Sequence, residues 1–120
     1  MKQNTSNMPK VVEDCHELLA WIIPKLDQFP RNRRFTLGER IETGLLMVLE
    51  NLILAAYQRS KTDNLKTANL QLDVVRHLWR LSHGLQAVSH KSYGQGAEHL
   101  TNLGRQIGGW RKQSESVRAS

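Results

Sequence analysis

The chain has 120 residues, which gives room for one domain with one hydrophobic core and leaves none for a second. Apolar residues make up 39% of it, a share that excludes an intrinsically disordered chain. Seventeen Lys and Arg against eleven Asp and Glu give a net charge of +6, and this surplus favours polyanionic partners, either nucleic acid or an anionic membrane surface.

The first predicted element is a helix over residues 9–28, ahead of which residues 1–8 are expected to be flexible. Its apolar residues recur at three- and four-residue spacing and form one stripe: Val11, Cys15, Leu18, Leu19, Ile22 and Leu26. Acidic residues lie on the opposite side near the helix N-terminus, where negative charge suits the helix dipole. Pro24 lacks an N–H and crowds the preceding turn, so we expect it to bend this helix or end it early.

A connecting loop is predicted over residues 29–35, and the second helix starts directly after it. Thr36 and Glu39 have the spacing of a capping box, in which each side chain satisfies a backbone N–H near the helix start. This helix is expected to continue to about Arg59. A turn follows, in which Asp63 is a candidate N-cap for a third helix that ends near Gln86.

The fourth helix is predicted to begin near His90 and to stop at Gly108 and Gly109, because paired glycines are a poor helix interior. Residues 113–120 are mostly small and polar and are expected to form a flexible tail. Short connections between long helices place neighbouring helices antiparallel. Residues 9–112 are therefore predicted to fold as an all-α, up-down-up-down four-helix bundle.

Two of these helices have more apolar surface than a single bundle core can cover. The second helix has one apolar stripe (Leu37, Ile41, Leu45, Val48, Leu52 and Ala55) and further apolar residues on other sides (Leu46, Met47, Leu49, Ile53, Leu54 and Tyr57). The third helix has two stripes: Leu70, Val74, Leu78, Leu81 and Leu85, and Leu65, Ala68, Leu72, Val75 and Trp79. Leaving one of them in water would create a large exposed apolar patch, so we expect the bundle to self-associate. A compact monomer with a large core is the alternative.

Cationic side chains gather on the polar face of the third helix, which carries Lys66, Arg76, His77, Arg80 and His83 around Asp73. The fourth helix, its end and the first loop add more: Lys91, Arg105, Arg111 and Lys112, and Arg31, Arg33 and Arg34. Such stripes can neutralise phosphates. An ordinary solvated helix face has the same composition, and the net charge could serve only to keep a small protein in solution.

No pattern of catalytic or metal-binding residues stands out, so we predict neither an enzyme nor a cofactor. Glu13 and His16 have the Glu-x-x-His spacing of di-iron bundles, but such a site needs the motif from two helices. Glu13 also points away from the apolar stripe, whereas Cys15 lies within it and is predicted to be a buried hydrophobe. Neither a nucleophile–base arrangement nor a P-loop or dinucleotide fingerprint is present.

The sequence also lacks signals for export or membrane insertion. Cys15 is the single cysteine, which favours a reducing compartment. Residues 1–10 are polar and lack the apolar core of a signal peptide. The longest apolar run, Leu45–Ala56, is interrupted by Glu50 and Asn51 and is shorter than the roughly 20 residues that cross a bilayer. We therefore expect a cytoplasmic location and no membrane partner.

Three segments are distinctive in combination: residues 29–41 (FPRNRRFTLGERI), 68–78 (ANLQLDVVRHL) and 103–112 (LGRQIGGWRK). Together they resemble the accessory variability determinant (Avd) proteins of diversity-generating retroelements, over roughly residues 29–112. The resemblance implies a four-helix bundle that assembles into a basic, barrel-like homopentamer. It also implies association with the reverse transcriptase of the retroelement and with its template RNA during mutagenic copying into cDNA. A broader relative is the bundle family encoded in intervening sequences of bacterial 23S rRNA genes.

The resemblance offers no catalytic residues, and candidate contacts with nucleic acid or a partner are chosen by charge and helix face: Arg31, Arg33, Arg34, Arg76, Arg80, Lys91, Arg105, Arg111 and Lys112. We expect a non-enzymatic accessory factor that binds the reverse transcriptase and template RNA or cDNA to support mutagenic retrohoming. Two alternatives stay open. One is a protein–protein adaptor whose basic surface meets an acidic partner, and the other is a bundle of the intervening-sequence type without a nucleic-acid role.

Overall fold

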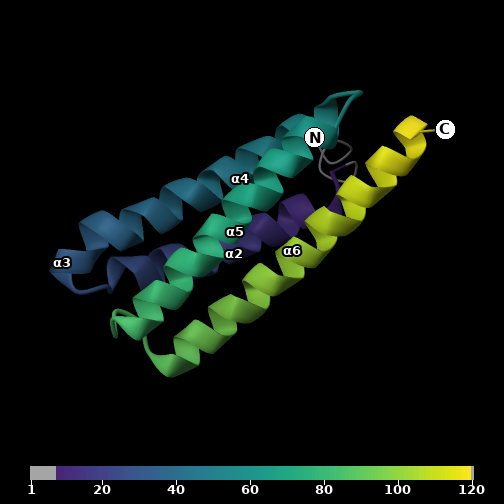
Figure 1. Cartoon of the computed structure of the whole chain (residues 1–120). Helices are drawn as coiled ribbons and strands as arrows, with labels where there is room; N and C mark the ends of the chain where they lie inside the picture. The colour runs from purple at the N-terminus through teal and green to yellow at the C-terminus, as the bar shows by residue number, and fades with distance from the viewer. Residues whose placement is uncertain (1–7, 120) are drawn as a thin grey trace.

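The computed structural model describes residues 8–119, and over this range it contains helices and their connections but no strand. Four long helices form an antiparallel bundle (Figure 1): α2 (Lys10–Asp27), α4 (Glu39–Tyr57), α5 (Thr62–Gly84) and α6 (His90–Ala119). Helix α4 packs against α2 and α5, and α6 packs against the same two helices from the other side. The prediction of an all-α four-helix bundle is confirmed, while residues 1–7 of the predicted flexible segment lie outside the described residues.

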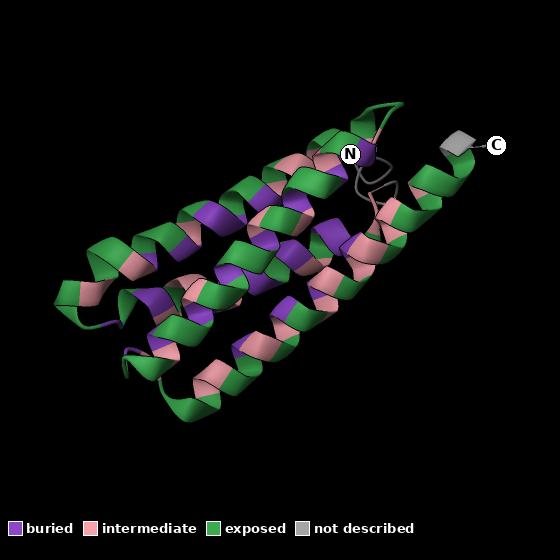
Figure 2. Cartoon of the chain, viewed as in Figure 1, coloured by how far each residue is buried: buried purple, intermediate pink, exposed green. Residues whose placement is uncertain are grey.

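Each long helix turns one stripe of apolar side chains inward (Figure 2). The most deeply buried of them, none more than 1% exposed, include Cys15, Leu18, Ile22, Ile41, Leu45, Leu52, Leu65, Leu72, Trp79, Leu100, Leu103 and Ile107. Burying one such Leu or Ile side chain stabilises the fold by about 1.5–3 kcal/mol relative to leaving it in water. Of the two apolar stripes predicted on α5, the one that ends in Trp79 faces the core, and the one that begins at Leu70 is largely exposed.

The segment before α4 is helical, so the predicted loop is wrong. After Pro30, the short helix α3 (Arg31–Arg33) leads into η1 (Arg34–Gly38), a π-helical turn that runs directly into α4. The carbonyl of Pro30 accepts hydrogen bonds from the N–H groups of Arg33 and Arg34, at 2.8 and 2.9 Å. Proline favours a helix start because its φ is already fixed near the helical value. The helix therefore begins several residues earlier than expected.

The predicted capping box does not form, because the chain is already helical when it reaches Thr36. The Thr36 hydroxyl donates to the carbonyls of Asn32 and Arg33, at 3.4 and 3.3 Å, instead of accepting a bond from a free N–H. Ser and Thr inside helices commonly make this backward bond. Glu39 is the first residue of α4, and its side chain is exposed.

The turn between α4 and α5 is ordered by a lysine, and Asp63 is not the N-cap that was predicted. Helix α5 begins at Thr62, which places Asp63 within its first turn. The Lys61 ammonium donates to the carbonyls of Ala55 and Gln58, at 2.8 and 2.7 Å. These carbonyls lie at the C-terminus of α4, where positive charge and extra donors are stabilising.

The glycine pair Gly108–Gly109 does not end α6, contrary to the prediction, and Pro24 does not end α2. In both cases the helix continues because a side chain beyond the helix-breaking residue packs on the core: Leu26 is buried, and Trp110 is partly buried against the core cluster. Burial offsets intrinsic costs of about 1 kcal/mol for a helical glycine and about 3 kcal/mol for a proline. Helix α6 therefore extends through part of the predicted tail, whose flexibility remains a prediction.

Asp14 links α2 to α6. Its carboxylate accepts hydrogen bonds from Gln106 and Asn102 of α6, at 2.7 and 3.3 Å, and pairs with Lys10 of its own helix at 2.6 Å. Lys10 lowers the pKa of Asp14 most, and Gln106 follows. Because the pKa is lowered on folding, this contribution to stability is present above the ordinary carboxyl pKa and is lost as pH falls through the lowered one.

Trp79 is the largest buried side chain, and it determines how α6 packs on α5. Its indole N–H donates to the carbonyl of Tyr93 at 3.0 Å. A Cβ atom at Gly96 would lie 2.6–2.7 Å from three atoms of the same indole. Side chains do not approach that closely, so the contact between the two helices requires glycine at this position.

Gly96→Ala should destabilise the bundle by about 1–3 kcal/mol through overpacking against Trp79. Gly94→Ala is the matched control, because Gly94 lies in the same helix with nothing within 4 Å of its Cβ position. The control should be neutral or gain up to about 1 kcal/mol from the higher helix propensity of alanine. Urea unfolding followed by circular dichroism measures both variants. Equal stability of the two would contradict the close approach.

Candidate nucleic-acid interface

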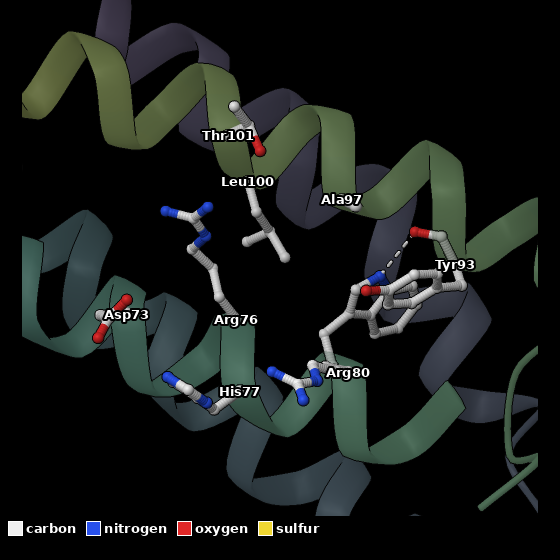
Figure 3. A pocket seen from close by; sticks show the side chains of 9 residues that line it. Asp73, Arg76, His77, Arg80, Tyr93, Ala97, Leu100 and Thr101 are labelled. Atoms are coloured by element: carbon white, nitrogen blue, oxygen red, sulfur yellow. Dashed lines mark hydrogen bonds between the residues drawn. The ribbon is translucent and has the colours of Figure 1, made fainter. Parts of the chain in front are cut away.

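A groove runs between α5 and α6 on the outside of the bundle. Its first part is a cavity of about 260 Å³ lined by Asp73, Arg76, His77, Trp79, Arg80, Tyr93, Ala97, Leu100 and Thr101. Figure 3 shows Arg76 extending from α5 toward Leu100 and Thr101 of α6, with Arg80 one turn further along. The floor is apolar and the rim is basic, a combination suited to a ligand that carries negative charge.

A second hollow of about 510 Å³ continues the groove toward the C-terminal half of α6. It shares Asp73 and Arg76 with the first and adds Lys66, Thr67, Asn69, Leu70, Leu72 and Arg111. Gly104 lies beside the shared arginine: a Cβ atom there would lie 3.6 Å from Nη1 of Arg76, an ordinary van der Waals contact. Along its length the groove therefore carries Lys66, Arg76, Arg80 and Arg111 against the single carboxylate of Asp73.

Within residues 8–119, the two central arginines of the groove make no ion pair. Among residues 8–119 the ion pairs are Lys10–Asp14, Arg34–Asp27 and Arg111–Glu115, and none of them involves Arg76 or Arg80. Both side chains are exposed. A guanidinium presents five N–H donors in a planar fork that matches phosphate or carboxylate oxygens. The groove therefore presents two unpaired guanidinium groups, one helical turn apart, to an incoming anion.

The structure brings together only part of the predicted contact set. Arg76, Arg80 and Arg111 line the groove, whereas Lys91, Arg105 and Lys112 are exposed on α6 but line neither hollow. Arg31, Arg33 and Arg34 belong to α3 and η1, at the end of the bundle where α2 leads into α4. The predicted residues thus form three groups: those that line the groove, isolated cations on α6, and a cluster of arginines in α3 and η1.

Four groove residues of α6 did not appear among the predicted contacts: Tyr93, Ala97, Leu100 and Thr101. Their three- and four-residue spacing places them on one face of α6, which the sequence pattern could have revealed. The same pattern does not tell which face of α6 meets α5. That depends on the contact of Gly96 with Trp79, which requires knowledge of the helix pairing.

Other reactive side chains build no site in the described part of the chain. Cys15 is fully buried, and burial raises the pKa of its thiol to about 12, which keeps it protonated and unreactive at neutral pH. Across residues 8–119, no group of three or more His, Cys, Asp or Glu side chains is arranged to hold a metal ion. Glu13 and His16 are both exposed, and none of the described helices is long and apolar enough to cross a bilayer.

A family model described as bAvd-like matches residues 10–114, which span the four long helices except for the last residues of α6. The chain therefore belongs to the bAvd-like family, in agreement with the resemblance seen in its sequence. No curated protein matches the chain.

Arg76→Glu combined with Arg80→Glu should weaken RNA binding without loss of helicity. If each arginine neutralises one phosphate, the slope of log K against log salt should fall by about 2. Arg40→Glu with Arg59→Glu is a charge-matched control, because both residues are exposed, outside the groove and free of ion pairs. Fluorescence anisotropy over a salt series measures the slopes. An equal loss in the two double variants would mean that net charge, and not the groove, governs binding.

Proposed function

We propose that this member of the bAvd-like family is a non-enzymatic accessory factor of a diversity-generating retroelement. It works in the cytoplasm, where it binds the reverse transcriptase of the element and its template RNA or cDNA and so supports mutagenic retrohoming. Family membership supports the accessory role. The observation that carries the binding role is the α5–α6 groove, in which Arg76 and Arg80 form no ion pair with any residue of the described range 8–119.

The groove favours a polyanion over a small neutral ligand for electrostatic reasons. Four cationic side chains lie along one side of the bundle. Asp73 offsets one of them, and Glu115, which pairs with Arg111, offsets a second. Binding a phosphate chain there releases its condensed counterions, which supplies affinity that falls as salt rises. The contacts would be to the backbone of the nucleic acid and would carry little sequence preference.

We also propose that copies of this chain associate, and the resemblance suggests a pentamer. Large apolar side chains remain exposed on the outer sides of α4 and α5 (Figure 2): Leu46, Met47, Leu54, Tyr57, Leu70, Val74, Leu81 and Leu85. Soluble monomers rarely expose contiguous apolar patches larger than a few hundred Å². Covering these side chains with a second copy removes them from water and adds the favourable free energy of apolar burial.

A protein–protein adaptor is the second candidate function, and one feature of the groove favours it. Leu70, which is 68% exposed, lines the same hollow as Lys66 and Arg111. A partner segment with an acidic and an apolar side chain would satisfy this surface better than a sugar-phosphate backbone. In that case the chain would bind the polymerase and not the RNA.

The accessory role is tested by a pull-down of the purified protein with the reverse transcriptase encoded beside its gene. The capture is performed with and without template RNA, at low and moderate salt. Salt-sensitive capture of both polymerase and RNA is the expected result. Capture of polymerase alone would favour the adaptor, and capture of neither by a folded protein would refute the accessory role.

Self-association predicts that the wild-type protein sediments as a species several times heavier than the 13.8 kDa chain. Leu70→Glu with Leu81→Glu should shift it toward the monomer, because each charge would have to be buried in the contact. Val117→Glu serves as the control, since Val117 is exposed near the end of α6 and is not one of these side chains of α4 and α5. Sedimentation velocity at micromolar concentrations measures all three. A wild-type protein that sediments only at 13.8 kDa would rule out self-association.

A further inference from the structure

The turn that precedes α4 holds an aromatic side chain in solvent next to three arginines. Phe35 is 62% exposed, and Arg34 places its guanidinium carbon 5.4 Å from the centre of the phenyl ring. Arg31 and Arg33 belong to the same stretch of chain and form no ion pair within residues 8–119. We call residues 31–35 the basic tip. It lies apart from the α5–α6 groove, neither hollow of which it lines.

The local backbone explains why Phe35 points outward. It occupies the π-helical turn η1, in which Leu37 is half-buried and Gly38 is buried. A Cβ atom at Gly38 would lie 3.7 Å from the ring of Phe29, so this side of the turn packs against the bundle. Phe35 lines a hollow of about 220 Å³ beside this turn, together with Arg34, Gly38 and the acidic residues Asp27, Glu39 and Glu42, and its ring stays mostly in water. Single π-helical turns inside α-helices occur frequently at functional sites.

Packing does not account for this exposed ring. Within residues 8–119, Phe35 stacks on no other aromatic ring and its one cation–π contact is with Arg34, whereas Phe29, six residues earlier, is buried and stacks on Trp79 with ring centres 6.4 Å apart. The ion pair of Arg34 with Asp27 is long, at 3.4 Å, and both side chains are about half exposed. Such surface pairs are weak and exchange readily for another anion.

An aromatic face flanked by cations suits a single-stranded nucleic acid best. Unpaired bases stack on exposed aromatic rings, and the phosphates on either side of the base are within reach of nearby arginines. A duplex covers the faces of its bases and offers the ring nothing to stack on. An acidic peptide would engage the arginines but leave the phenyl ring in water, and an apolar partner would desolvate the arginines without compensation.

We infer that the basic tip binds single-stranded nucleic acid, with an unpaired base stacked on Phe35 and the adjacent phosphates held by Arg31 and Arg34. This inference rests on the proposed contact with template RNA or cDNA. It adds a second contact point to the α5–α6 groove and assigns it a preference for unpaired strands. The groove would bind the phosphate backbone of single-stranded or double-stranded nucleic acid, and the basic tip would select the single-stranded part.

The test compares Phe35→Leu, Phe35→Tyr and the wild-type protein on a single-stranded RNA with 2-aminopurine in place of one adenine, and on its duplex. Phe35→Leu should weaken single-strand binding about tenfold and abolish the 2-aminopurine quenching, because the stacking face is lost. Phe35→Tyr should keep the single-strand affinity and the 2-aminopurine quenching within about twofold of the wild-type values, because a tyrosine ring also stacks on bases. Duplex binding should be the same for all three.

Val117→Ala is the control for loss of an exposed apolar side chain outside the basic tip, because Val117 is 69% in water near the end of α6. It should bind single strands like the wild-type protein. Unchanged single-strand binding by Phe35→Leu would overturn the inference, as would an equal loss for single strand and duplex. A shift of Phe35→Leu to a smaller species in sedimentation would instead assign Phe35 to a contact between copies. Wild-type protein that binds neither form of RNA would refute the proposed nucleic-acid role itself.

Discussion

The close contact between Trp79 of α5 and Gly96 of α6 determines the arrangement on which the rest of the structure depends. The indole also bonds to the carbonyl of Tyr93 and stacks on its ring, with ring centres 6.3 Å apart, and meets Trp21 of α2 edge-on. One side chain thus sets the position of two helices relative to α5. A larger residue than glycine on α6 would push the helices apart at the point where the groove is narrowest.

The groove follows from this contact by simple helical geometry. Arg76 lies three residues before Trp79 and Arg80 lies one residue after it. Because the Trp79 side chain points into the core, helix geometry places both arginines at the edge of the α5–α6 contact. Arg76 extends toward Leu100 and Thr101 of α6 and lies beside Gly104. Among residues 8–119 no carboxylate pairs with either arginine, so their charge is available to a partner. The contact between Trp79 and Gly96 therefore determines both the packing of α5 against α6 in the core and the position of the two arginines on the surface.

The sequence was sufficient for the fold class and for the buried stripes of α2 and α4, because an apolar repeat of three to four residues is a local property. On α5 the sequence contains two such stripes, and the helix packing decides that the stripe ending in Trp79 is the buried one. The helix ends were predicted poorly. Thr36, Asp63 and the pair Gly108–Gly109 carry ordinary end signals, yet the helix starts earlier, after Pro30, and Trp110 packs against the core beyond the glycines. The α6 side of the groove was missed for a related reason, since it depends on how two distant segments pair.

The most direct test of the account is a map of protein–RNA contacts by ultraviolet cross-linking and mass spectrometry, using the full chain and template RNA. If the α5–α6 groove binds RNA, cross-linked peptides from residues 66–80 and 101–111 should dominate, because these segments line the groove. Cross-links confined to α2 or to the C-terminal end of α4, with none in the groove, would contradict binding in the groove.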